Sequence, residues 1–178
     1  MTPHRLIKIA ATGAAVAGLT VAAATSGAEP AAHDAGKAKI TRHGVDGVKL
    51  HMKYRTLLKR HLVHKIRHGC ELGGPNTREA RLVKPIKGIV TFSLHKPRRA
   101  KVITIRGGAE ARGVGIHDSL ADIMEQYPNA QEDHSTDDTF GVTLVRTPKR
   151  HGSRITFAID TDTHEIVRIG VPEIAFCE

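Results

Sequence analysis

Three closely spaced histidines are the residues that most directly suggest chemistry. His61, His64 and His68 would lie on one side of a continuous helix, where imidazoles can bind Zn²⁺ or Cu²⁺. On a strand, His64 and His68 share a face and His61 does not. No carboxylate lies between His61 and His68 to complete or orient such a site. The spacing supports two hypotheses, an extracytoplasmic metal site and a set of solvent-exposed histidines.

The same stretch is rich in Lys and Arg and is a candidate polyanion site. Residues 37–101 contain 18 Lys and Arg against 3 Asp and Glu, whereas residues 102–178 contain 7 against 13. A segment this cationic attracts acidic wall polymers, nucleic acids and anionic lipid surfaces. The alternative is a solvated basic face that the acidic second half partly neutralises. The candidate residues are Lys53, Arg55, Lys59, Arg60, Lys65, Arg67, Arg98 and Arg99, with further cations at Arg78, Arg81, Lys84, Lys87, Lys96 and Lys101.

The sequence lacks the features of two other functional classes. Single-strand nucleic-acid readers stack bases on aromatic side chains, and only Tyr54 and Phe92 are close to the basic residues. We therefore expect no sequence-specific nucleic-acid binding. There is no phosphate-cradling glycine loop, no HExxH and no GxSxG. Ser93 has His95 on the same strand face but no third group to orient the imidazole. We predict a protein that is not an enzyme and needs no cofactor.

The first residues carry the pattern of an exported protein. Residues 1–8 are positively charged, residues 9–25 are apolar and uncharged, and Ser26-Gly27-Ala28 is a small-residue cleavage sequence. The apolar run is rich in Ala and Gly and is short for a membrane span of roughly 20 residues. We predict a signal peptide over residues 1–28, cleaved after Ala28 or alternatively after Ala24. The mature protein is then secreted and has no transmembrane segment.

The predicted export indicates a structural role for the two cysteines. Cys70 and Cys177 are the only cysteines, so only one pairing exists. Disulfides are the default in an oxidising compartment. The bridge would enclose about 107 residues and stabilise the fold by roughly 4–5 kcal/mol in the chain-entropy estimate. We predict a Cys70–Cys177 disulfide.

A repeated pattern defines the elements that must position these residues. Gly47-Val48-Lys49-Leu50-His51 and Gly113-Val114-Gly115-Ile116-His117 each precede a short helical pattern. In the second copy Ser119 and Asp122 match a capping box, and apolar residues recur at helical spacing as far as Tyr127. The corresponding helix of the first copy covers residues 52–60.

Alternating residues after each helix predict short antiparallel strands. The second copy has them at residues 140–146, 154–160 and 165–171, and the first copy has them at residues 88–94 and around 102–105. A short helix laid on a small antiparallel sheet, used twice, predicts the α+β class. We predict a disordered leader over residues 29–43, a basic first unit over residues 44–108 and an acidic second unit over residues 109–178.

This repeat resembles a superfamily of exported proteins that holds the beta-lactamase inhibitory protein and small outer-membrane assembly lipoproteins. It is also similar to secreted actinobacterial proteins of unknown function. The resemblance covers residues 44–178 through the Gly-Val-x-Leu/Ile pattern that precedes Leu57-Leu58 and Ile123-Met124. Such repeats often carry Gly before the helix, where this chain has His51 and His117, and the sequence leaves the reason open.

The resemblance implies a secreted, non-catalytic binding protein, in the first place a protein-binding module of the inhibitor type. One alternative is a polyanion or cell-envelope binder that uses the basic first unit. The other is a metal-binding protein that uses the His cluster. The expected partner is accordingly an unidentified protein or an anionic envelope polymer.

Overall fold

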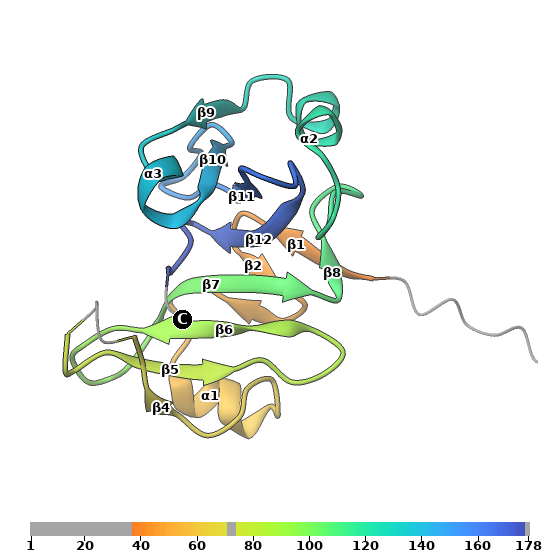
Figure 1. Cartoon of the computed structure of the whole chain (residues 1–178). Helices are drawn as coiled ribbons and strands as arrows, with labels where there is room; N and C mark the ends of the chain where they lie inside the picture. The colour runs from red at the N-terminus through yellow and green to blue at the C-terminus, as the bar shows by residue number, and fades with distance from the viewer. Residues whose placement is uncertain (1–36, 71–73, 177–178) are drawn as a thin grey trace, which may run out of the picture. The chain divides into compact units, whose positions relative to one another are not determined.

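The described part of the chain, residues 37–70 and 74–176 of a computed structural model, is mostly β-structure (Figure 1). Strands and bridges take up 43% of these residues and helices take up 12%. The predicted α+β class is therefore wrong. The predicted signal peptide and Cys177 lie outside the described residues.

Two sheets make up the fold. The larger one has eight antiparallel strands in the order β4-β5-β6-β7-β12-β11-β10-β9, and the smaller one has the order β3-β2-β1-β8 with a parallel β1–β8 pair. The strands of the larger sheet are β4 (Arg67–His68), β5 (Arg78–Arg81), β6 (Lys87–Phe92), β7 (Ala100–Gly107), β9 (Gln131–Asp133), β10 (Val142–Arg146), β11 (Thr156–Asp160) and β12 (Ile166–Val171). Those of the smaller sheet are β1 (Ala38–Thr41), β2 (Gly44–Val45), β3 (Val48–Lys49) and β8 (Ala109–Glu110). The helices are α1 (Tyr54–Lys59), α2 (Leu120–Gln126) and α3 (Asp137–Phe140).

The class prediction failed because the strands of the two copies do not form two separate sheets. Strand β7 from the first copy pairs with β12 from the second, with Ile105 opposite Ile169, and joins both sets into one sheet. The predicted strands themselves lie close to β6, β7, β10, β11 and β12. Alternation in a sequence indicates a strand but not its partner, so a merger through long-range pairing escapes sequence reasoning.

Part of the predicted leader forms a strand in the structure. Residues 38–41 of the predicted leader form β1, which pairs with β2 and, in parallel, with β8. Ile40 is 4% exposed and belongs to the main core. Burial of Ile40 and strand pairing on both sides of β1 offset the conformational entropy that this polar segment loses when it becomes ordered.

Both copies begin with the same tight turn. Asp46-Gly47 and Arg112-Gly113 all have positive φ, at 38°, 83°, 55° and 87° in that order. Positive φ at both central residues matches the twist of two-residue hairpins, and Gly adopts it without steric cost. The turn then leads into α1 in the first copy and α2 in the second. The repeat seen in the sequence therefore corresponds to a repeated backbone conformation.

The main core lies against one face of the eight-stranded sheet, called here the inner face. Val90, Ile103 and Phe157 point into it and are fully buried, and Leu57 of α1 and Ile123 of α2 pack there with them. Since side chains alternate along a strand, the residues between these positions lie on the opposite, outer face. The candidate site lies on this outer face.

Candidate functional site: a basic groove on the outer face of the sheet

The outer face differs between the two halves of the sheet. Over β9–β12, called the covered half, Val142, Leu144 and Ala158 form a small second core with Ile174 of the C-terminal segment. Phe176 packs against this cluster, and its ring stacks on Phe140 of α3 with centroids 4.5 Å apart. The C-terminal segment thus covers the apolar outer face of this half.

Hydrogen bonds hold the C-terminal segment on the sheet. Thr156 Oγ1 donates to the carbonyl oxygen of Pro172 at 2.9 Å, and the Ala175 amide donates to Thr104 Oγ1 at 3.2 Å. Gly170 permits the close approach, because a Cβ there would lie 2.3 Å from the carbonyl oxygen of Glu173. The C-terminal segment can therefore lie this close to the sheet only because position 170 has no side chain.

Over β4–β7, called the open half, the outer face holds a groove of about 700 Å³. Its cationic lining comes from β4 to β7 and the β5–β6 turn, and consists of Arg67, Arg81, Lys84, Lys87 and Arg106. We call this set the groove cations, and His64, from the residues before β4, lies beside them in the lining. One carboxylate, Glu79, shares the lining.

Strand register explains why these side chains converge. Arg67 lies opposite Glu79 across β4–β5, and Arg81 lies opposite Ile89 across β5–β6. Directly opposite residues share a face, and Glu79 and Arg81 share one because they are two positions apart. The His64 amide donates to the Arg81 carbonyl oxygen at 2.9 Å, which holds the chain before β4 beside β5.

Three apolar residues border the groove. Leu82 and Ile86 belong to the main core and are only 5% and 6% exposed, whereas Ile89 on β6 is half-buried. The Leu82 amide donates to the Gly88 carbonyl oxygen at 3.0 Å, which closes the β5–β6 hairpin. Of these three residues, Ile89 therefore exposes the largest fraction of its surface.

The charge of the groove is strongly positive. Glu79 is buried and already paired, since Arg67 donates to its Oε1 from both Nε, at 2.8 Å, and Nη2. Within the residues that the structure describes, Arg81, Lys84 and Lys87 form no ion pair, and all three are exposed. Several cations facing one hollow concentrate their field there and raise the local concentration of anions.

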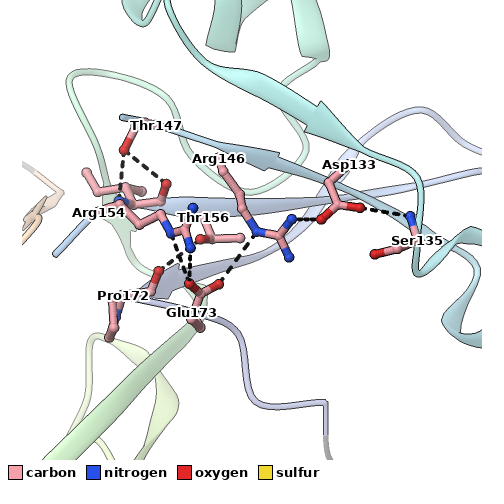
Figure 2. A network of polar contacts seen from close by, with 9 residues as sticks. Asp133, Ser135, Arg146, Thr147, Arg154, Thr156, Pro172 and Glu173 are labelled. Atoms are coloured by element: carbon pink, nitrogen blue, oxygen red, sulfur yellow. Dashed lines mark hydrogen bonds and ion pairs between the residues drawn. The ribbon is translucent and has the colours of Figure 1, made fainter. Parts of the chain in front are cut away.

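A second hollow of about 580 Å³ lies on the covered half, and the arginines that line it are paired with carboxylates. Figure 2 shows Arg146 between Asp133 and Glu173, with Arg154 on the same Glu173. The Arg154 Nη2–Glu173 Oε1 distance is 2.7 Å and the Arg146 Nε–Glu173 Oε2 distance is 3.7 Å. Both arginines already have carboxylate partners. This hollow should therefore attract an anion less strongly than the groove does.

The structure divides the predicted polyanion residues between different surfaces. Lys53, Arg55, Lys59 and Arg60 belong to α1 and its two ends, and α1 packs on the inner face. Arg67 alone of the predicted set lines the groove. The remaining predicted residues lie outside its lining: Lys65, Arg98 and Arg99.

Two of these arginines already bind backbone oxygens. Arg98 Nη1 donates to the Ser93 carbonyl at 3.2 Å, and Arg99 Nη1 donates to the His51 carbonyl at 3.0 Å. Both contacts lie within the loop between β6 and β7 or next to it. Their guanidinium groups therefore help to hold this loop against the turn before α1.

The predicted metal residues lie in three different local surroundings. His61 lies in the turn after α1 with a φ of 55°, His64 lines the groove, and Arg78 Nη1 lies 3.1 Å from His68 Nδ1. Across residues 37–70 and 74–176, no three His, Cys, Asp or Glu side chains gather closely enough to hold a metal ion. The helix that would have aligned the three histidines ends at Lys59.

The two histidines before the helices have a conformational role. His51 and His117 have φ values of 64° and 75°, in the left-handed region. Their amides make equivalent hydrogen bonds, His51 to the Ala100 carbonyl at 2.8 Å and His117 to the Ile166 carbonyl at 2.9 Å. Histidine is one of the few residue types other than Gly enriched in this region. His is therefore compatible with this backbone conformation, which Gly also adopts readily.

Sequence reasoning missed the groove as a unit. It placed Arg81, Lys84 and Lys87 among the further cations and did not single out Arg106. The available signal was the alternation of Glu79 and Arg81, but four residues are a short pattern for a strand. Only the pairing of β5 with both β4 and β6 brings these residues to one face.

Comparisons of the chain with models of protein families, with curated proteins and with solved structures find no match. Among the described residues, no helix has the length and apolar character needed to cross a membrane. The groove and its charged side chains are the features of this chain that bear on function.

Proposed function

We propose that this protein is a secreted, non-catalytic binding protein that holds a polyanionic ligand in the groove of the open half. The observation that carries the proposal is the convergence of the groove cations on one hollow, where Glu79, the one carboxylate among the described lining residues, is already paired. Three of these cations have no ion-pair partner among the described residues, so an incoming anion need not displace an acidic side chain.

A binding experiment with matched charge changes tests this proposal. The Lys84→Glu/Lys87→Glu variant alters two groove cations, and the Arg55→Glu/Lys59→Glu variant makes the same charge change on α1. We expect retention of the groove variant on a heparin column to fall sharply, and its affinity for polyphosphate to fall about tenfold or more. We expect the α1 variant to lose much less.

The salt dependence provides a second measurement. The logarithm of the polyphosphate affinity should fall with the logarithm of salt concentration less steeply in the groove variant, by about 1 to 2 in slope. Equal losses in the groove and α1 variants would show that the whole basic surface attracts the ligand, and the proposal would then be wrong.

The protein-binding module implied by the family resemblance is the second candidate. The relatives are expected to grip a partner with an aromatic sheet face, but here the stacked pair Phe140 and Phe176 lies on the covered half. A protein partner bound to the open half would have to be recognised mainly by charge. The predicted export supports either candidate, since anionic polymers and acidic proteins both occur outside the cell.

A further inference from the structure

The loop between β6 and β7 exposes a leucine on a backbone that is held by hydrogen bonds. Leu94 in this loop is 50% exposed. The Ser93 amide donates to the Arg99 carbonyl oxygen at 2.8 Å, and Ser93 Oγ donates to the His95 carbonyl oxygen at 3.1 Å. The Arg99 amide donates in turn to Ser93 Oγ at 3.0 Å. Because the loop is already constrained, a partner that binds it loses little conformational entropy in ordering it.

Helix α1 adjoins this loop and exposes a second leucine. The Tyr54 amide at the start of α1 donates to the Arg98 carbonyl oxygen at 2.9 Å. The Tyr54 ring also meets the ring of Phe92, the last residue of β6, edge to face with centroids 5.4 Å apart. Leu58 lies one turn after Tyr54 on the same side of α1 and is 36% exposed. Leu58 and Leu94 are therefore exposed on two segments that are in direct contact.

Cations without acidic partners flank both leucines. The exposed cations of these two segments that form no ion pair within the described residues are Arg55, Lys59, Arg60 and Lys96. Residues 47–70 and 80–109, which include both segments, contain no Asp or Glu. We call the two leucines and these four cations the loop–helix surface. None of its residues lines the groove, so it is a second basic surface of the chain.

We infer that the loop–helix surface binds an anionic lipid bilayer, with Leu58 and Leu94 entering the interface and the four cations at the lipid headgroups. Each Lys or Arg close to such a surface adds to the electrostatic attraction, and each apolar side chain adds by leaving water. Lys and Arg beside a leucine suit this boundary, since their stems lie along apolar groups while their charges stay in water. This inference goes beyond the proposed function, which concerns the groove.

A folded protein partner fits this surface less well. The centre of a protein–protein interface is depleted of charged residues and enriched in aromatic ones. Here each leucine has a cation within two residues, and the aromatic side chains of the region, Tyr54 and Phe92, are half-buried and buried. Separate leucines with cations between them suit a bilayer interface, where apolar and charged groups each meet their own layer.

Co-sedimentation of the full mature protein with lipid vesicles tests the inference. One set of vesicles is phosphatidylcholine alone, and the other is an equal mixture of phosphatidylcholine and phosphatidylglycerol. We expect the protein to bind the mixed vesicles at moderate salt and to bind the neutral vesicles at least about tenfold more weakly, because only the mixed vesicles attract the cations.

Substitution of the leucines links binding to the loop–helix surface. Leu58→Ser/Leu94→Ser should reduce the affinity for mixed vesicles about tenfold or more, because two apolar side chains no longer leave water. Ile89→Ser, on the outer face of the sheet, is the matched apolar-to-serine control and should retain vesicle binding. Circular dichroism and thermal melting show whether each variant keeps its fold.

Two charge variants with the same change in net charge compare this surface with the groove. Arg55→Glu/Lys59→Glu should lower the affinity for mixed vesicles about tenfold or more. Lys84→Glu/Lys87→Glu should lower it much less, because the groove lies on the outer face while α1 packs on the inner face. Interactions between exposed charges fade over roughly 10 Å at moderate salt. For polyphosphate, the order of the two losses should be reversed.

The outcomes separate this inference from the proposed function. Failure of the wild type to bind mixed vesicles, or equal losses of vesicle binding in the two charge variants, would overturn the inference and leave the groove unaffected. Full vesicle binding by Leu58→Ser/Leu94→Ser would also overturn it, because charge alone would then hold the protein on the bilayer. Concentration-dependent self-association that the same variant abolishes would assign the surface to a second copy of this chain and would likewise overturn the inference.

Discussion

The open and covered halves of the sheet share a strand framework but differ in what lies on their outer faces. On the covered half, Leu144 and Ala158 face outward and are buried beneath Ile174. On the open half, Arg81 faces outward and Ile89 next to it is half-buried. The covered half thus uses its outer face for stability, and the open half keeps its outer face accessible.

The same contrast appears in the turns before the helices. His117 Nδ1 lies 2.9 Å from Glu165 Oε2, whereas the equivalent turn of the first copy has Arg99 Nη1 donating to the His51 carbonyl. The backbone of the two turns is equivalent, but an acidic residue in one copy is replaced by a basic residue in the other. The repeat therefore preserves backbone structure while the surface charge of the copies differs.

The largest expected effect comes from the predicted disulfide that would tie the C-terminal segment to the open half. Cys70 Sγ lies 3.6 Å from the carbonyl oxygen of Phe176, the residue before Cys177 in the sequence. We expect Cys70→Ser to lower the free energy of unfolding by roughly 4 kcal/mol, measured by denaturant titration.

Mass spectrometry of the purified mature protein checks the same bond directly. The mass should be that of the reduced chain less two hydrogens, and should rise by two hydrogens on reduction. Rapid alkylation of both cysteines in the native oxidised protein would contradict the prediction.

The second effect compares the two outer faces. Ile174→Ala on the covered half should lower the free energy of unfolding by about 2–4 kcal/mol, because it leaves a cavity over Leu144 and Ala158. Ile89→Ala on the open half should cost about 1 kcal/mol, because Ile89 is only half-buried. Equal costs in urea titrations would show that the open half is as closely packed as the covered half.

The third effect compares the two helices. The N-cap Ser119 of α2 accepts from the Asp122 amide and forms the predicted capping box, which is confirmed, whereas the N-cap Lys53 of α1 makes no side-chain capping bond. We expect Ser119→Ala to cost about 1 kcal/mol and Lys53→Ser to gain about 0.5 kcal/mol. Thermal unfolding of both variants measures the two changes in stability. A loss of stability in Lys53→Ser would contradict the comparison of the two helices.

The smallest effect is the pH dependence of the α2 cap. Hydrogen bonds from the Ser119 hydroxyl, and then from the Ser119 amide, lower the pKa of Asp122 below its ordinary value. A lowered pKa in the folded state means that the stabilisation is complete above about pH 4 and is lost as pH falls through the folded pKa.

Asp122→Asn should accordingly be less stable than the wild type at pH 6, and the difference should shrink near pH 2. Denaturant midpoints at both pH values provide the measurement. A difference that stays constant between these pH values would show that the carboxylate charge plays no part in the cap.

The locally encoded parts of the fold were predictable. Helix α2 and its cap follow from apolar residues at helical spacing after Ser119, and β11 follows from the alternation up to Asp160. Such patterns depend on neighbouring residues, so they can be read without knowledge of the tertiary structure. Strand β1 was missed because four residues with one buried apolar side chain do not make a pattern.

The candidate site was only partly predictable. The sequence indicated that the cations lie in the first copy, and Arg67 belongs to both the predicted set and the groove. It also grouped Arg67 with Lys53, Arg55 and Lys59, whereas in the structure these neighbours along the chain lie on different surfaces, since α1 packs on the inner face. Arg106 joins the groove through β7, far from Arg67 in sequence.

The sequence by itself determined the repeat, the charge difference between the copies, the cap of α2 and several strands. These features arise from local spacing and composition, which act over a few residues. The tertiary structure decided that the strands of both copies form one sheet, and that the C-terminal segment covers one half. It also decided that cations from four strands and a turn line one groove, since strand register brings together side chains that are distant in sequence.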